Sequence, residues 1–496
     1  MKQTDKKFTK MSLIGLKKKE IPKTFTNINL QLLIILLFLV FLPFQIFSQT
    51  KIEGVSSSYS GDELKLCKIS DRITFTHEVI SSALVDSAGN FEFSFDINRI
   101  EKVYIDLPTL RAFLYVEPEK SYEIRIPSKI EMTDEQFLNP YFSKEYVPAM
   151  IVKSPENDIN LLIIEYNSFL NEQKNKLVKI TNDKKEKEFI DSIKVISDTF
   201  MQNIDNEYFV YHKMTDFALL RHYHIQYKKS FFTDSFFVQM PVLFNSASYM
   251  GLFNLVFDDP FKTGNSIVSL KYVYAGIKNH NFIMIKDSII SKFPKISETF
   301  AELLTIKGLY NKFYEIPQTQ NDIIATLQNV LSDDVNDDVL NIIQNILIEI
   351  TTLRVGNPAP QFELPNFKGK NINLTDYKGG FVYIQFFHQN SFACMQQMPL
   401  LKNYSDQKIK GLNILTVFVQ DNVEQMKEFL ENNKDYKWDF VFMSKNDELL
   451  KKYNVTVYPT YFLVDPDGNL CLPETPAPTD NFEQTYNAQF KKWFGN

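Results

Sequence analysis

The stretch that decides the fold of the C-terminal region is FVYIQFFHQNSFACMQQMP, residues 381–399. Its first seven residues form a nearly continuous apolar run, which is typical of a β-strand that is buried on both faces of a sheet. We expect a helix to follow, beginning near Cys394. A buried strand that leads into a helix predicts an α/β arrangement.

Strands and helices alternate around this stretch, over residues 353–496. Beyond it we expect a strand in LNILTVFV, helices in VEQMKEFLENN and DELLKKY, and a hairpin made of TYFLVD, the turn PDGN and LCLP. A last helix is expected to end near Phe494. One β-α-β unit closed by a hairpin and a helix predicts an α/β sandwich.

Two regions with other periodicities precede it, so the chain is predicted to be multidomain. Residues 50–152 alternate apolar and polar positions, which predicts a small antiparallel β-sandwich or barrel. In it, RITFTHEVI (72–80) is expected to be a strand and DSAGN (86–90) a turn. Residues 153–352 have helical spacing, which predicts an all-α domain whose first helix has Ser154 as its N-cap.

Residues 1–49 have the composition of a secretory signal peptide. Eight lysines and two acidic residues give this segment a charge of +6, and an apolar stretch follows at residues 30–44. This order is typical of a signal peptide, here cleaved after Ser48 or Gln49, and an uncleaved membrane anchor is the alternative. We therefore expect a periplasmic or secreted protein with no membrane span after cleavage.

Charge and cysteine content exclude several classes of protein. Residues beyond 49 carry −12, which would repel a phosphate backbone, so no nucleic-acid binding is predicted. With only Cys67, Cys394 and Cys471, the chain lacks a disulfide framework, and Cys67 and Cys471 are expected to be small apolar fillers. His222 and His224 stand two apart in an expected helix, where their side chains diverge, so we predict neither a metal site nor a cofactor.

Residues 353–496 resemble the thioredoxin-like family, in particular its extracytoplasmic TlpA/ResA type within the AhpC/TSA redoxins. The resemblance is carried by VGNPAPQFEL (355–364), FFHQNSFACMQQMP (386–399) and YNVTVYPTYFLVDPDGN (453–469). The two regions in front are similar to those that precede such domains in Bacteroidetes-like secreted proteins. The resemblance implies that Pro459 is the family's cis-proline. It also implies that Pro459, Tyr458 and Phe392 bind the substrate.

The chemistry implied by the resemblance needs two cysteines. One at a helix N-terminus attacks a substrate disulfide, because N–H groups and the helix dipole favour its thiolate. Another, three residues on, resolves the mixed disulfide. Here Cys394 holds the second position, but Ser391, a poor nucleophile without a base, holds the first. Gln385 also stands where many thioredoxins keep a buried acid, so two-cysteine exchange is predicted to be lost.

The leading hypothesis is therefore a redox-impaired thioredoxin-like protein that binds an extracytoplasmic protein or peptide partner. The alternative is a thiol enzyme that uses Cys394 alone, by monothiol exchange or peroxiredoxin-like peroxide reduction. Peroxiredoxins carry a Ser or Thr three residues before their cysteine, but here Phe387 replaces their proline and the last arginine is Arg354. We expect His388 to be a loop histidine, because a triad with Ser391 would need a carboxylate and an oxyanion hole that the sequence does not indicate.

Overall fold

The computed structural model describes residues 49–200, 204–224, 229–331, 335–472 and 474–495. The predicted signal peptide lies outside these residues, except for Gln49. Within the described ranges, no helix combines the length and the apolar character needed to cross a membrane.

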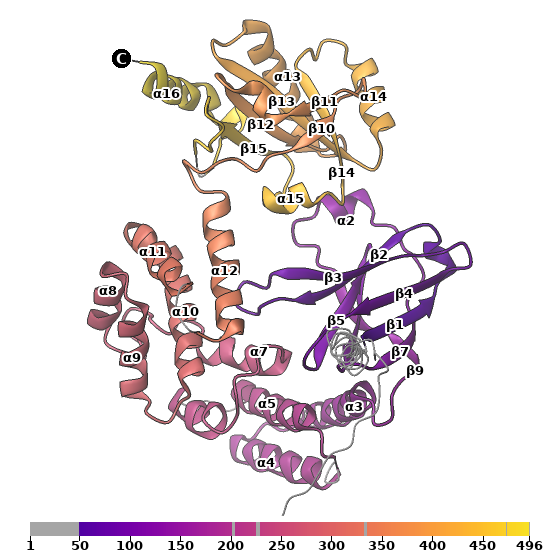
Figure 1. Ribbon diagram of the computed structural model, residues 1–496, viewed down its shortest axis with the longest axis vertical. Helices are drawn as coiled ribbons and strands as arrows, with labels where there is room; N and C mark the ends of the chain where they lie inside the picture. Colours follow the sequence, from indigo (N-terminus) through magenta and orange to yellow (C-terminus); the bar gives the residue numbers. More distant parts are fainter. Residues whose placement is uncertain (1–48, 201–203, 225–228, 332–334, 473, 496) are drawn as a thin grey trace, which may run out of the picture. The chain divides into compact units, whose positions relative to one another are not determined.

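The first part of the described chain contains two β-sheets (Figure 1). One has the strand order β4-β1-β7-β9 and the other β3-β2-β5-β6-β8. The strands are β1 (Thr50–Val55), β2 (Glu63–Ile69), β3 (His77–Leu84), β4 (Asn90–Phe95), β5 (Glu101–Asp106), β6 (Leu110–Val116), β7 (Ser121–Arg125), β8 (Glu145–Pro148) and β9 (Met150–Lys153). Both sheets bury their inner faces in one apolar core. A short helix, α2 (Asp134–Leu138), lies between β7 and β8.

Two details of the β prediction are wrong. The sheets are not wholly antiparallel, because β1 pairs in parallel with β7 and β6 with β8. Parallel neighbours need a crossover rather than a hairpin, and the period-two pattern does not show which strands are joined that way. RITFTHEVI is also not one strand. β3 begins at His77, and residues 70–76 form a turn in which the Asp71 carboxylate accepts the N–H groups of Ile73 and Thr74 at 2.8 Å.

The turn predicted at residues 86–90 is present between β3 and β4. Its Gly89 has φ +90°, and a Cβ there would lie 2.7 Å from the backbone nitrogen of Ser57. A glycine is therefore required at this position both by the backbone conformation and by the close approach of the neighbouring segment.

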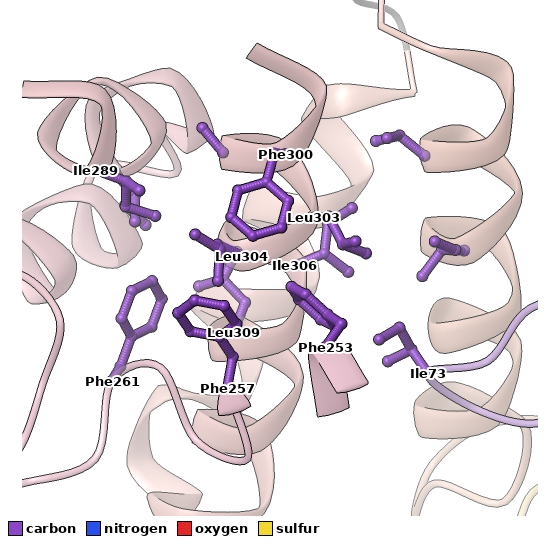
Figure 2. Close-up of a cluster of buried hydrophobic side chains, with 14 of the residues drawn as sticks. Ile73, Phe253, Phe257, Phe261, Ile289, Phe300, Leu303, Leu304, Ile306 and Leu309 are labelled. Carbon is purple, nitrogen blue, oxygen red and sulfur yellow. The ribbon is translucent and has the colours of Figure 1, made fainter. Parts of the chain in front are cut away.

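The middle part of the chain is helical, as predicted. Its helices are α3 (Ile159–Leu177), α4 (Asp183–Phe200), α5 (Glu207–His224), α6 (Lys229–Phe232), α7 (Ala247–Val256), α8 (Leu270–Lys278), α9 (Phe282–Lys292), α10 (Glu298–Glu315), α11 (Gln320–Val330) and α12 (Asp337–Thr352). The prediction of Ser154 as the first N-cap is wrong, because Asp158 caps α3 by accepting the N–H of Asn160 at 2.9 Å. Figure 2 shows the core of these helices, into which Ile73 from the β region inserts.

The C-terminal part has a four-stranded sheet with the order β14-β13-β12-β15, in which β12 is parallel to β13 and antiparallel to β15. The strands of this sheet are β12 (Phe381–Phe387), β13 (Leu412–Gln420), β14 (Asp439–Ser444) and β15 (Thr460–Val464), and a separate two-stranded sheet consists of β10 (Glu363–Pro365) and β11 (Asn371–Asn373). The helices of this part are α13 (Phe392–Gln407), α14 (Val423–Asn432), α15 (Glu448–Lys452) and α16 (Phe482–Phe494). Every residue of β12 is buried, with an apolar cluster on each face of the sheet. This arrangement confirms the thioredoxin-like fold.

The sequence prediction differs from this sheet in two places. It missed β14, whose apolar residues follow a helix and a turn without a clear alternation. It also placed a strand at LCLP, where Leu470 forms only an isolated bridge with Val464. The expected hairpin therefore closes through a single residue pair, so β15 is one edge of the sheet, and the unpredicted β14 is the opposite edge.

Candidate active site

The candidate site is the turn of residues 388–391, where β12 gives way to α13. Ser391 is the N-cap of α13, and its Oγ accepts the N–H of Cys394 at 3.3 Å. The same hydroxyl donates to the carbonyl oxygen of Tyr458 at 2.9 Å. A serine hydroxyl has one hydrogen to donate, so Ser391 uses it to hold the turn against the loop before β15.

The loop that Ser391 contacts carries the proline implied by the resemblance. The peptide bond between Tyr458 and Pro459 is cis. Beside it, apolar side chains remain open to solvent: Phe392 is 77% exposed, Val457 47% and Met395 38%. The turn therefore presents an apolar rim next to the cis-proline, and Phe392 is accessible to a binding partner.

Cys394 has no exposed surface in the described structure. It lies in the first turn of α13 within the apolar cluster that includes Met398 and Phe418. Burial raises the pKa of its thiol to about 11, and hydrogen bonds with the His388 backbone and the Ser391 hydroxyl offset only part of that effect. At pH 7 roughly one thiol in ten thousand is then ionised, and the thiolate is the nucleophilic form.

Gln385 belongs to a neutral hydrogen-bonded network inside the sheet. Its Nε2 donates to the Tyr461 hydroxyl and its Oε1 accepts from the Thr416 hydroxyl, both at 3.1 Å. Thr416 in turn accepts the indole N–H of Trp438 at 2.9 Å. Gln385 is directly opposite Thr416 on β13 and Tyr461 on β15, so strand register builds the network. None of these side chains titrates near neutral pH, so the network cannot take up a proton there.

His388 lies in the loop after β12, as predicted, and its side chain is fully buried. Its Nδ1 accepts the N–H of Asn390 at 3.3 Å, and its Nε2 lies 3.6 Å from the Asp134 carboxylate with no hydrogen-bond partner among the described residues. Burial lowers the pKa of His388 to about 4, against the attraction of Asp134. The Ser391 hydroxyl donates to Tyr458 rather than to His388, so no Ser–His pair is formed.

The comparisons with known proteins agree with this geometry. The model of the AhpC/TSA family matches residues 355–471. The thiol-disulfide oxidoreductase ResA of Bacillus thuringiensis subsp. konkukian is 32% identical over 120 residues, which are 24% of this chain and 68% of that protein. The chain belongs to the ResA-like thiol-disulfide oxidoreductase family. ResA of Bacillus subtilis is 30% identical over 133 residues, which are 26% of this chain and 73% of that protein.

Solved structures of thiol-disulfide oxidoreductases are also similar to part of the chain. The thioredoxin domain of a thiol-disulfide oxidoreductase from Bacteroides vulgatus is 29% identical, with 27% of this chain and 98% of that chain covered at a TM-score of 0.25. A putative thiol:disulfide interchange protein DsbE from Chlorobium tepidum is 27% identical, with 27% and 97% covered at the same TM-score.

Among the other sequence candidates, Cys471 packs against the same apolar cluster as Cys394. All three cysteines are free, with Cys67 buried and Cys471 half-buried. Arg354 donates to Asn321, and no arginine of the described residues is among the groups that shift the pKa of Cys394. His222 and His224 are in α5. The described ranges contain no group of three or more His, Cys, Asp or Glu side chains that could hold a metal ion.

Sequence reasoning missed three residues that lie at the turn of residues 388–391: Asp134, Phe137 and Lys445. The first two belong to α2 in the β region, and they contact His388, Asn390 and Tyr458. No local pattern marks them, because Asp134 and Asn390 are 256 positions apart in the chain.

Proposed function

We propose that this ResA-like chain acts by binding an extracytoplasmic protein or peptide partner, and that its thiol-disulfide exchange is lost or much reduced. The observation that carries the proposal is the state of the Ser391–Cys394 pair. The Ser391 hydroxyl accepts the N–H of Cys394 as the helix cap and donates to the Tyr458 carbonyl. Cys394 is buried, and burial raises its pKa to about 11. Disulfide exchange starts with an accessible thiolate, and neither residue supplies one.

The binding surface in this proposal is the edge formed by Tyr458, Pro459 and the exposed Phe392. Large apolar side chains that stay exposed beside a shaped edge are typical of protein-interaction sites. The neutral network around Gln385 supports the loss of thiol-disulfide exchange, because no side chain in it can take up or release a proton near neutral pH.

The proposal places the mature chain outside the cytoplasm. It is supported by the order of charged and apolar residues over positions 1–49. In the same proposal, residues 50–152 and 153–352 are accessory domains of a secreted protein of Bacteroidetes type, joined to the ResA-like domain at 353–496.

The test of this proposal is the Ser391→Cys variant of the full chain. The introduced thiol and Cys394 would form an S–S bond, passing two electrons and two protons to a mild oxidant such as oxidised glutathione. We expect the oxidised variant to lose about two mass units, as bond formation requires, and to reduce insulin slowly once it is itself reduced. The parent should do neither, and a parent that reduces insulin would overturn the proposal.

A matched control for that variant is Ser405→Cys, on the same helix but eleven positions from Cys394. It should form no bridge with Cys394. Because Ser391→Cys weakens the cap of α13, we expect it to cost about 1 kcal/mol in stability, and circular dichroism should show that the fold is retained. If both thiols of the Ser391→Cys variant stay free under oxidant, the assignment of this turn as the family's active site is wrong.

The alternative, catalysis by Cys394 alone, makes a separate prediction. A working thiol enzyme would consume peroxide or a mixed disulfide quickly, and Cys394→Ala would abolish that activity. We expect instead that Cys394 of the folded protein reacts with iodoacetamide at pH 7 roughly a hundredfold more slowly than a free cysteine, because so little of it is thiolate. Fast alkylation at neutral pH would favour the enzyme.

A further inference from the structure

The short helix α2 of the β region covers part of the candidate binding surface. It lies in the connection between β7 and β8, residues 126–144, and begins with a capping box formed by Thr133 and Gln136. The Thr133 hydroxyl accepts the N–H of Gln136 at 3.2 Å and the Gln136 side chain accepts the N–H of Thr133 at 3.1 Å. This box stabilises one helical turn that presents Asp134 and Phe137 together.

Asp134 binds polar groups of the ResA-like region. One carboxylate oxygen accepts from the Lys445 ammonium at 2.5 Å, and the other accepts from the side-chain amide of Asn390. Asn390 immediately precedes Ser391. Lys445 is 10% exposed and is also paired with Asp421 at 2.9 Å, so its charge is held in a fixed position at the edge of the site.

Phe137 supplies the apolar half of the contact. Its ring centre lies 5.5 Å from that of His388 and 5.5 Å from that of Tyr458, the residue before the cis-proline. The Lys445 ammonium is 5.4 Å from the centre of the same ring. Ring separations of this size are typical of favourable aromatic pairs, and a cation over the ring adds to them.

Without α2, this surface would have several groups in need of partners. Asn390 would lose its carboxylate, and Lys445 would keep only Asp421. The buried His388 Nε2, which has no hydrogen-bond partner in the described ranges, would lose its nearest negative charge. The rings of His388 and Tyr458, which contact each other, would both lose their contact with the phenyl ring of Phe137. An occupant that satisfies all of these needs a carboxylate and an aromatic ring on one face.

We propose that α2 occupies the partner-binding surface from within the chain, and that the external partner is a peptide segment of the same chemistry, with a carboxylate followed three residues later by an aromatic side chain. This inference rests on the proposed binding function. The partner competes with α2 for Lys445, Asn390 and the Tyr458 ring. Only molecules in which α2 is undocked can bind the partner, so the apparent affinity is the intrinsic affinity multiplied by the undocked fraction.

The test uses a fluorescent peptide with the chain's own residues 131–140, EMTDEQFLNP, and full-length protein. Binding is measured by anisotropy to the parent and to an Asp134→Asn/Phe137→Ala variant, in which α2 loses both anchors. We expect the variant to bind the peptide at least about tenfold more tightly than the parent. Adding Lys445→Ala to the variant should weaken that binding again by about tenfold, since it removes the carboxylate's partner.

Glu135→Gln is the matched control, because it removes one negative charge from the same helix at an exposed position. It should bind the peptide like the parent. Peptides with Asp→Asn or Phe→Ala at the two anchor positions should bind the released variant at least about fivefold more weakly. A general effect of charge would appear in the Glu135→Gln control, and a general effect of hydrophobicity would leave the carboxylate-free peptide unaffected.

Hydrogen exchange gives an independent measurement in case a variant is poorly folded. Exchange of residues 388–394 should increase in the released variant and return toward the parent's level with saturating peptide, while β1 and α10 stay unchanged. The inference is overturned if the released variant binds the peptide no more tightly than the parent, or if exchange at residues 388–394 does not change. Insulin reduction by the parent would overturn the proposed function instead, so the two failures are distinguishable.

Discussion

The β region contacts the helical region and the ResA-like region in two different ways, one through a buried apolar side chain and the other through a partly exposed ion pair and an aromatic ring. Its turn at residues 70–76 enters the core of the helical region, and α2 contacts the rim of the ResA-like turn. At the turn, Ile73 is buried among helical side chains, and the Asp71 carboxylate accepts from the Asn345 side chain at 2.8 Å. At α2, the contact is an ion pair and an aromatic ring, and the Asp134 side chain is 32% exposed.

This difference indicates which contact is permanent and which can be exchanged. An apolar side chain removed from a packed core leaves a cavity that the core cannot fill, so its departure is costly. A partly exposed ion pair is worth much less, because water and salt compete with it. We therefore expect the turn at residues 70–76 to stay docked while α2 opens and closes.

The largest effect on stability is expected for Ile73→Ala. The substitution should lower the free energy of unfolding by about 3 kcal/mol, since it removes a buried side chain from the cluster in Figure 2. Urea unfolding followed by circular dichroism measures it. Phe75→Ala, on the same turn but 54% exposed, is the control and should change stability by less than about 0.5 kcal/mol. If Ile73→Ala and Phe75→Ala lowered the free energy of unfolding equally, burial of Ile73 would not explain the effect.

Lowering the pH should destabilise the region that α2 contacts, because His388 becomes protonated. Its pKa is lowered by burial from 6.5 to about 4, so the folded state favours the neutral ring. The free energy of unfolding is therefore highest above pH 6.5, where the ring is neutral in both states, and it falls as the pH drops toward 4, because only the unfolded state binds the proton. Between pH 7 and pH 5 the loss should be about 2 kcal/mol.

The variant that isolates this effect is His388→Asn, whose side-chain oxygen can still accept the N–H of Asn390. Burial also lowers the pKa values of His77 and His212, so the parent loses stability in acid through them as well. The difference between parent and variant therefore reports His388 together with its charge coupling to Asp134. If both lose the same stability between pH 7 and pH 5, His388 is not held neutral by the fold.

A smaller effect is expected for Asp71→Asn, which alters only the polar part of the turn. One oxygen that accepts from Thr74 or Asn345 becomes a donor, so a buried hydrogen bond is lost, at a cost of about 1.5 kcal/mol. Thermal unfolding of parent and variant measures it. The control is Asp86→Asn in the exposed turn of residues 86–90, where water can replace the lost acceptor and the loss should be smaller. A larger loss at Asp86 would contradict this account.

The smallest effect on stability is expected for Asp134→Asn. It weakens a partly exposed pair with Lys445 and should cost about 1 kcal/mol or less, with the fold otherwise retained. Hydrogen exchange at residues 388–394 should nevertheless increase, because α2 is less firmly docked. A loss of stability as large as that of Ile73→Ala would show that α2 is a permanent part of the core and not an exchangeable occupant.

Features that depend on near neighbours in the chain were predictable from sequence. The buried strand β12, the start of a helix after Ser391 and the end of helical structure at Thr352 all follow from periodicity and capping within a few residues. The motif around Ser391 and Cys394 also indicates the family, and it has a serine where the resemblance predicts the first cysteine. Such features depend on residues within about one helical turn of each other in the chain, so they can be predicted from the sequence alone.

Tertiary structure alone decided the features that rest on distant residues. The burial of Cys394, which raises its pKa, comes from β13 and neighbouring elements rather than from SFAC itself. The acceptor and donor for Gln385 stand opposite it on two other strands. Likewise, the carboxylate beside Asn390 is Asp134, 256 positions away. Burial, pKa and surface occupation depend on which segments meet in space, and local periodicity carries no information about that.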